Sequence, residues 1–110
     1  MVVTRDGIRI GLLATDSIGE TPSATSRRPG TNRLNMPPRT GPLNRADLAR
    51  IAADIRTLKR TVDVVVVMPH WGTQYTHRPE PSQRTAARAF AEAGADLVIG
   101  GHPHLSLIHI

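Results

Sequence analysis

The stretch VDVVVVM at residues 62–68 decides the fold class, because it is a nearly continuous run of β-branched side chains. Such a run is typical of a strand that is buried on both faces, as in a parallel sheet covered by helices. On either side of it, the segments GIRIGLLA at residues 7–14 and DLVIG at residues 96–100 are also short and apolar. Turn-forming or polar residues bound both segments, so each predicts a further strand.

A first helix is predicted after the Pro-rich segment that follows residue 15. The side chain of Asn44 can cap it, and Asp47 suits the positive end of the helix dipole. Its apolar residues recur at helical spacing and form one face: Leu48, Ile51, Ala52, Ile55 and Leu58.

A second helix is predicted from about Pro81 to the residue before Gly94. Its inward positions are Ala86, Phe90 and Ala93. Strands joined by a helical crossover are parallel. The sequence therefore predicts an α/β fold in which strands 62–68 and 97–100 are parallel neighbours joined by a helical crossover.

The basic charge of the chain does not indicate a nucleic-acid partner. The 110 residues carry a formal net charge of +5, and 13 of the 14 basic residues are Arg. These arginines are scattered along the chain, and no aromatic residues are interleaved to stack on bases. No nucleic acid is expected. The absence of Cys excludes thiolate metal sites, so any metal would need His, Asp, Glu or Asn ligands.

Residues 16–44 contain five prolines among Gly, Ser, Thr and Arg, and they predict a long loop. A loop of this length inside a domain is either a functional cover or a flexible linker. If strand 7–14 is parallel to the others, the loop leaves it at the carboxyl edge of the sheet. We therefore expect it to lie over that edge and to form part of a pocket wall, with a low-complexity linker as the alternative.

Three histidines follow the ends of two predicted neighbouring strands. His70 comes two residues after strand 62–68, while His102 and His104 come directly after strand 96–100. Parallel sheets bind ligands at the carboxyl ends of their strands. The single residue between His102 and His104 lets both rings face one side, and imidazole suits zinc, iron or manganese. The sequence therefore predicts that His70, His102 and His104 converge as metal ligands.

The surroundings of these histidines have competing interpretations. A single His after a strand is often only a loop residue, and His77 lies in a polar turn where we expect a surface position. The residues that could line the pocket are Trp71, Gly72, Tyr75 and Gly101. Among them, Trp71 is expected to pack beside the site, and Tyr75 could either face the pocket or cover the loop.

Residues 69–104, PHWGTQYTHRPEPSQRTAARAFAEAGADLVIGGHPH, resemble the CapA-like family of bacterial poly-γ-glutamate capsule-synthesis proteins. The shared features are H-W-G at His70, a nearby Tyr, P-x-Q-R at Pro81, A-G-A-D, and the G-x-H-P-H turn. A weaker match extends the resemblance back to about Val3. At Gly101 many relatives carry another His.

The resemblance implies a fold related to the calcineurin-like metallophosphatases, a four-layer α/β/β/α sandwich around a two-metal site. By this resemblance His70 is the isolated metal-ligand histidine, and His102 and His104 are the pair of the G-H-x-H block. The family's early motifs, an aspartate block, an N-L-E-like block and an N-N-H block, are absent. Residues 1–104 are accordingly expected to be an incomplete, C-terminal fragment of such a domain.

For function, the resemblance implies poly-γ-glutamate capsule biosynthesis with one or two divalent metal ions. The full-length parent would be a metal-dependent hydrolase, whose catalytic residues the resemblance does not define. The fragment alone is expected to be inactive. The alternative is a non-catalytic module that binds an anionic polymer. The partners of the parent protein would be an anionic polymer or a small substrate bearing phosphate or carboxylate, together with other capsule-synthesis proteins. The parent would lie in the cell envelope or outside the cytoplasm.

The last six residues, LSLIHI at 105–110, resemble the translation of a transposon-end adapter used in preparing sequencing libraries. We expect this tail to be non-native and to contribute nothing specific to the core. The alternative is a natural short apolar strand.

Overall fold

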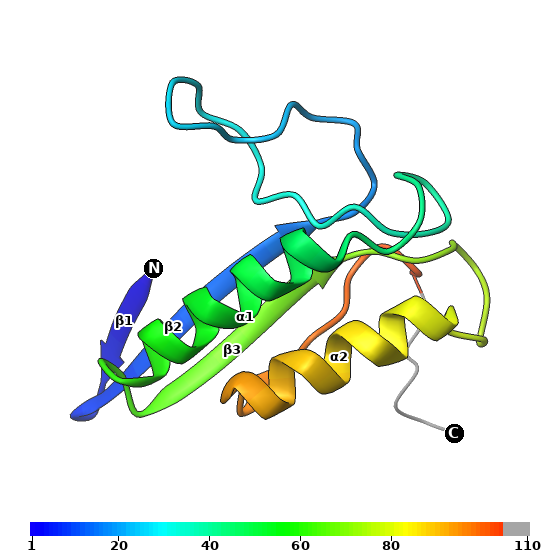
Figure 1. Ribbon diagram of the computed structural model, residues 1–110. Helices are drawn as coiled ribbons and strands as arrows, with labels where there is room; N and C mark the ends of the chain where they lie inside the picture. Colours follow the sequence, from blue (N-terminus) through cyan, green and yellow to red (C-terminus); the bar gives the residue numbers. More distant parts are fainter. Residues whose placement is uncertain (105–110) are drawn as a thin grey trace.

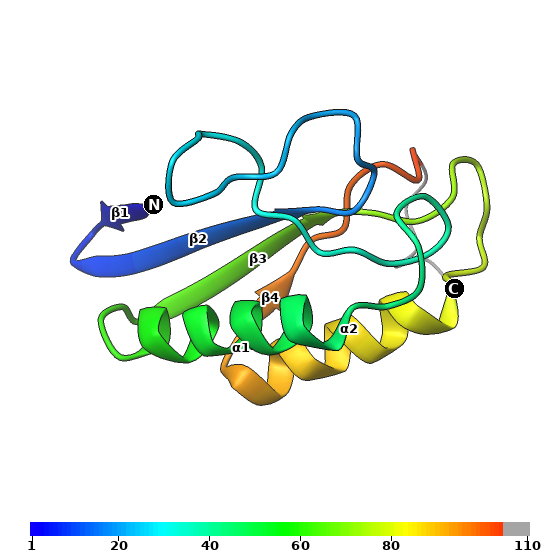
Figure 2. The same ribbon diagram turned by 45° about the horizontal axis from the view of Figure 1, so that its top comes forward.

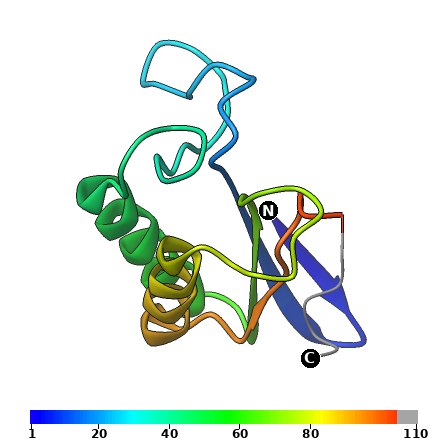
Figure 3. The same cartoon turned by 90° about the vertical axis from the view of Figure 1, so that its right-hand side faces the viewer.

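The computed structural model describes residues 1–104, and the tail predicted at 105–110 lies outside the described residues. One four-stranded sheet carries two helices on one of its faces (Figures 1 and 3). The elements are β1 (Val2–Arg5), β2 (Ile8–Asp16), α1 (Arg45–Lys59), β3 (Val64–His70), α2 (Pro81–Ala93) and β4 (Leu97–Val98).

The strand order is β1-β2-β3-β4, and the α/β prediction is confirmed. Strand β3 pairs in parallel with β2 on one side and with β4 on the other. The helices α1 and α2 are the two crossovers, which explains why all three strands end at the same edge. At that edge the register places Asp16 opposite His70.

Strand β1 was not predicted. It pairs antiparallel with β2 through a two-residue turn at Asp6 and Gly7, both at positive φ (50° and 79°). A turn with two positive φ values matches the twist of a hairpin, and Asp-Gly is a preferred sequence for it. The signal was therefore present in the sequence.

Strand β3 runs two residues beyond its predicted end, so His70 is its last residue and does not follow it in a loop. The predicted strand ended at Met68, before Pro69, and a proline usually argues against a central strand. Pro69 is tolerated because its carbonyl still pairs, accepting the Gly101 N–H at 2.8 Å.

The centre of the valine run is buried on both sides, as predicted, with Val65, Val66 and Val67 all buried, but within residues 1–104 helices cover only one face of the sheet. Both helices pack on the face that carries Val65 and Val67, which are fully buried. The opposite face leaves large apolar side chains exposed: Ile8 at 49%, Met68 at 45%, Leu97 at 50% and Ile99 at 48%. The second sheet of the α/β/β/α sandwich is not among the described elements, so the four-layer architecture stays a prediction.

The helix boundaries agree with the predicted signals. The Asn44 side chain accepts the Asp47 N–H at 3.0 Å at the start of α1. Helix α2 begins with a capping box between Glu80 and Gln83 and ends at Gly94 in the left-handed conformation. The predicted inward faces of both helices are buried, apart from a partly exposed Leu58, and form one core with β3. Among the residues described, no helix is long and apolar enough to cross a membrane.

The loop that follows β2 lies beyond the carboxyl ends of the strands, as predicted, and so does the segment after β4 (Figure 2). The returning part of the loop is hydrogen-bonded to the end of β2. The Asp16 N–H donates to the Asn32 carbonyl, and the Leu34 N–H donates to the Asp16 carbonyl, both at 3.0 Å. Leu34 and Met36 are completely buried. The linker interpretation is therefore wrong for this returning part, whereas the tip at residues 19–30 is exposed.

Candidate histidine site at the carboxyl edge

The turn with His102 and His104 is held alongside His70 by the sheet itself. The Gly101 N–H donates to the Pro69 carbonyl at 2.8 Å, and the Trp71 N–H donates to the Gly101 carbonyl at 3.3 Å. These bonds continue the β3–β4 ladder past the end of β4. They place Gly101 opposite His70, so the next residue, His102, begins at the same edge.

The three predicted histidine rings form a row. The ring centroids of His70 and His102 are 4.9 Å apart with the planes nearly perpendicular, and those of His102 and His104 are 6.0 Å apart. Across residues 1–104, no group of three His, Cys, Asp or Glu side chains is arranged to hold a metal ion. The structure thus brings the histidines together, and their role as ligands stays a prediction.

The backbone of the turn is strained at the histidines. His102 and His104 both have positive φ, at 85° and 58°, a region that costs energy for residues other than Gly. Tyr75 is also at positive φ, and its N–H donates to the carbonyl of the buried Pro103 at 2.9 Å. Its ring stacks on His104 with centroids 5.6 Å apart. Of the two positions considered for Tyr75, the structure therefore shows it against the histidine row.

The electrostatic setting of His102 favours a neutral ring. Burial lowers the pKa of His102 from its ordinary value, and the nearby charges of His70, His104 and Arg39 lower it further, with Glu20 acting in the opposite direction. The uncharged imidazole has one nitrogen with a free lone pair, and this is the form of histidine that binds metals.

The other predicted pocket residues differ in how closely their surroundings pack against them. Trp71 is 6% exposed, and its ring stacks nearly parallel on Phe90, with centroids 6.2 Å apart. Gly72 has φ +83°, and a Cβ there would lie 2.6 Å from the Gln83 side chain. Gly101 has room, since a Cβ would meet nothing closer than 3.8 Å. His77 is exposed, as predicted.

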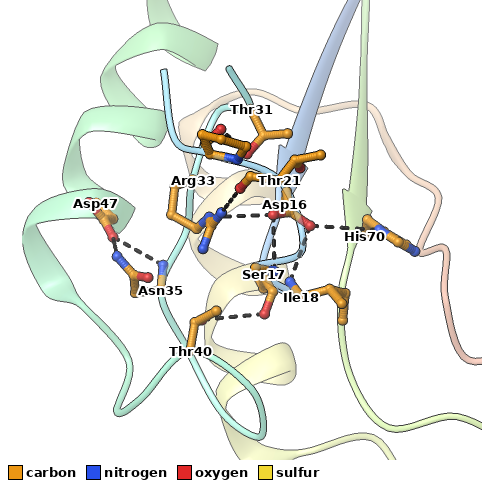
Figure 4. Close-up of polar contacts among 12 residues, drawn as sticks. Asp16, Ser17, Ile18, Thr21, Thr31, Arg33, Asn35, Thr40, Asp47 and His70 are labelled. Atoms are coloured by element: carbon orange, nitrogen blue, oxygen red, sulfur yellow. Dashed lines mark hydrogen bonds and ion pairs between the residues drawn. The ribbon is translucent and has the colours of Figure 1, made fainter. Parts of the chain in front are cut away.

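Asp16 and Arg33 beside His70 were missed by the sequence interpretation, which treated Asp16 as the first loop residue. The Asp16 carboxylate lies 3.3 Å from Arg33 Nε and 3.7 Å from His70 Nδ1 (Figure 4). The position of Asp16, an acidic residue at the carboxyl end of a parallel strand, was the available signal. Arg33 gave none, because its contact depends on how the loop folds back.

Sequence comparison with known proteins shows the family of the chain. The family model described as bacterial capsule synthesis protein PGA_cap matches residues 1–107. The chain belongs to this family. It is 34% identical over 101 residues to the capsule biosynthesis protein CapA of Bacillus anthracis, covering 91% of the chain and 23% of that relative. It is 47% identical over 51 residues to the PGA biosynthesis protein CapA of Bacillus subtilis (strain 168), covering 46% of the chain and 13% of that relative. The chain thus spans less than a quarter of the length of either relative.

In this PGA_cap family member, the A-G-A-D motif has a structural role. The Asp96 carboxylate accepts Lys59 Nζ at 2.6 Å and the Val65 N–H at 2.8 Å, which ties the end of α1, the start of β3 and the start of β4 together. The hydrogen bond from Lys59, followed by that from Val65, holds the pKa of Asp96 below its usual value.

The histidine row contains nitrogen donors of the type that bind divalent ions. Imidazole nitrogens are ligands for zinc and similar metals, and the His70 and His102 rings are already in edge contact. The lowered pKa of His102 favours the neutral form, in which an imidazole nitrogen can bind a metal. A closed coordination sphere would need further donors beyond the described part of the chain.

Proposed function

We propose that this chain supplies the histidine side of a divalent-metal site in a CapA-type capsule-synthesis protein. The observation that carries the proposal is the row of three histidine rings at the carboxyl ends of adjacent parallel strands. His70, His102 and His104 would hold one or two ions, and oxygen ligands would come from other parts of a longer protein. The two relatives, which are several times longer than the matched segments, support this division.

A bound divalent ion would polarise a phosphoryl or acyl oxygen, or activate a water, as in metal-dependent hydrolases. The residues of the chain would bind and orient the substrate. Arg39 lies near His102, and its exposed guanidinium is paired with the still more exposed Glu20 at 3.5 Å. A carboxylate or phosphate could replace Glu20 as its partner, which suits an anionic substrate such as poly-γ-glutamate. We further propose that the longer protein acts in the cell envelope, alongside other capsule-synthesis proteins.

A second candidate is a module that binds an anionic polymer without turnover. It is favoured by the lack of a ready three-ligand group within residues 1–104. In this case Arg39 and the histidines would hold the polymer directly. Polymer binding would then persist when metal is removed.

The test is calorimetric titration of the chain with Zn²⁺ and Mn²⁺. We expect weak binding that His104→Ala lowers by at least about tenfold, as expected for loss of a metal ligand or its support. His77→Ala is the matched control, because His77 is exposed and away from the row. Unchanged metal binding after replacement of all three histidines would refute the metal role. Titration with poly-γ-glutamate, with and without a chelator, separates the two candidates.

A further inference from the structure

The carboxylate of Asp16 is buried although it lies beside the exposed ring of His70. Only 12% of the Asp16 side chain is exposed, against 53% of that of His70. The two residues are register partners at the ends of β2 and β3. Partners in adjacent parallel strands project to the same face of a sheet, so the backbone alone keeps the carboxylate next to the imidazole.

Three further groups fix the orientation of this carboxylate. Asp16 Oδ1 accepts the Ile18 N–H at 3.1 Å, and Oδ2 accepts the Gly19 N–H at 3.2 Å. Arg33 Nε approaches Oδ2 at 3.3 Å, while its terminal nitrogen donates to the Thr21 carbonyl. The arginine is thus engaged on both sides and closes the loop over Asp16. The oxygen that remains nearest to His70 is Oδ1, at 3.7 Å from Nδ1.

We propose that Asp16 is a positioning residue for His70, which holds the ring with Nδ1–H toward Asp16 Oδ1 and leaves Nε2 free as the metal donor. Figure 4 shows Nδ1 facing Asp16 and the other ring nitrogen on the far side. A carboxylate accepts only, so it favours the tautomer that points a donor at it. Carboxylates behind metal-binding histidines commonly fix the tautomer in this way. The role of His70 Nε2 as a metal donor rests on the proposed function, whereas the tautomer of the His70 ring does not depend on it.

The tautomer of His70 is measured by long-range ¹H–¹⁵N correlation on the metal-free chain at about pH 8, where an ordinary histidine is neutral. A neutral histidine side chain in water prefers the Nε2–H form. We expect His70 to show the Nδ1–H form and exposed His77 the Nε2–H form. An Nε2–H ring at His70 in the unmodified chain would overturn the proposal, even if no variant can be prepared.

Asp16→Ala should return His70 to the Nε2–H form, while Asp54→Ala, which removes an exposed carboxylate on α1, should not. Arg33→Ala tests whether Asp16 acts only by ordering the loop: it releases the loop contact but leaves Asp16 bound to two backbone N–H groups. We expect the Nδ1–H form to survive in that variant. If Asp16→Ala does not fold, Asp16→Asn, which removes only the charge, should show a reduced Nδ1–H population. A tautomer insensitive to every change at Asp16 would overturn the proposal.

The metal arm uses Zn²⁺ titration of the same variants. Loss of an outer-shell carboxylate typically weakens metal binding by about tenfold to a hundredfold, and we expect this for Asp16→Ala relative to Asp54→Ala. If the unmodified chain binds no Zn²⁺, the proposed function fails while the tautomer still decides the role of Asp16. If Zn²⁺ binds through the histidines with equal affinity in Asp16→Ala, the positioning role fails and the metal site stands.

Discussion

Gly100→Ala should destabilise the chain through a single contact with Trp71. A Cβ at Gly100 would lie 2.7 Å from Trp71 Nε1, whereas ordinary van der Waals contact begins at 3.4 Å, so the two groups must separate by about 0.7 Å. The indole cannot give way easily, because it is buried and stacked on Phe90. Overpacking of this kind typically costs about 1–3 kcal/mol, and we expect a loss in that range.

Gly101→Ala is the matched control, since the same methyl group at the next residue would have its nearest neighbours at 3.8 Å. It should change the free energy of unfolding by less than about 0.5 kcal/mol, as for a surface substitution. Urea unfolding followed by the fluorescence of Trp71, the only tryptophan, measures both variants. Equal stability of the two variants would show that the Trp71 contact does not constrain the turn.

Three further outcomes are expected. Asn44→Ala should lower the free energy of unfolding by about 1 kcal/mol through loss of the α1 cap, whereas Asn44→Asp should retain it, as measured by urea unfolding. Asp96 has a lowered pKa in the fold, so its stabilisation is present above the unfolded-state value near 3.8 and is lost as pH falls through the lower folded value. Unfolding at several pH values should therefore show Asp96→Asn costing at most about 1 kcal/mol near neutrality, because the pair with Lys59 is solvent-screened, and less on acidification. Leu97→Thr on the open face should reduce binding of an apolar dye without loss of stability, and an unchanged dye signal would contradict the exposure of that face.

The elements with strong local signals were predictable from the sequence. Asn44 and Gly94 bound the helices because capping is a local property of the chain, and the spacing of Ile51 and Ile55 identified the buried face of α1. The end of β3 was mispredicted because the pairing of Pro69 with both neighbouring strands overrides the local preference of proline. Tertiary pairing decided that boundary.

The candidate site divides in the same way. The histidines were predictable because the strand order determines which residues reach the carboxyl edge. Asp16 was not identified, although it lies at the end of a strand, because it was interpreted as the first residue of the loop. Arg33 is 17 residues away and reaches Asp16 only after the loop has folded back. The exposed face of the sheet was also not predicted, because exposure at the end of β3, at Met68 and His70, depends on which elements are present to cover that face.

The geometry of the histidine row depends on a register that is set at the opposite end of the strands. Asp96 bonds to both the backbone N–H of Val65 and Lys59, and its own N–H donates to the Val65 carbonyl at 2.9 Å. From this point the ladder continues through Ile99 to Gly101, which pairs with the end of β3. A slip of one residue would reverse the faces of all following side chains and move His102 away from His70. The A-G-A-D motif, at the far end of β4, therefore affects the site by setting the strand register that brings His70 and the His102–His104 turn together.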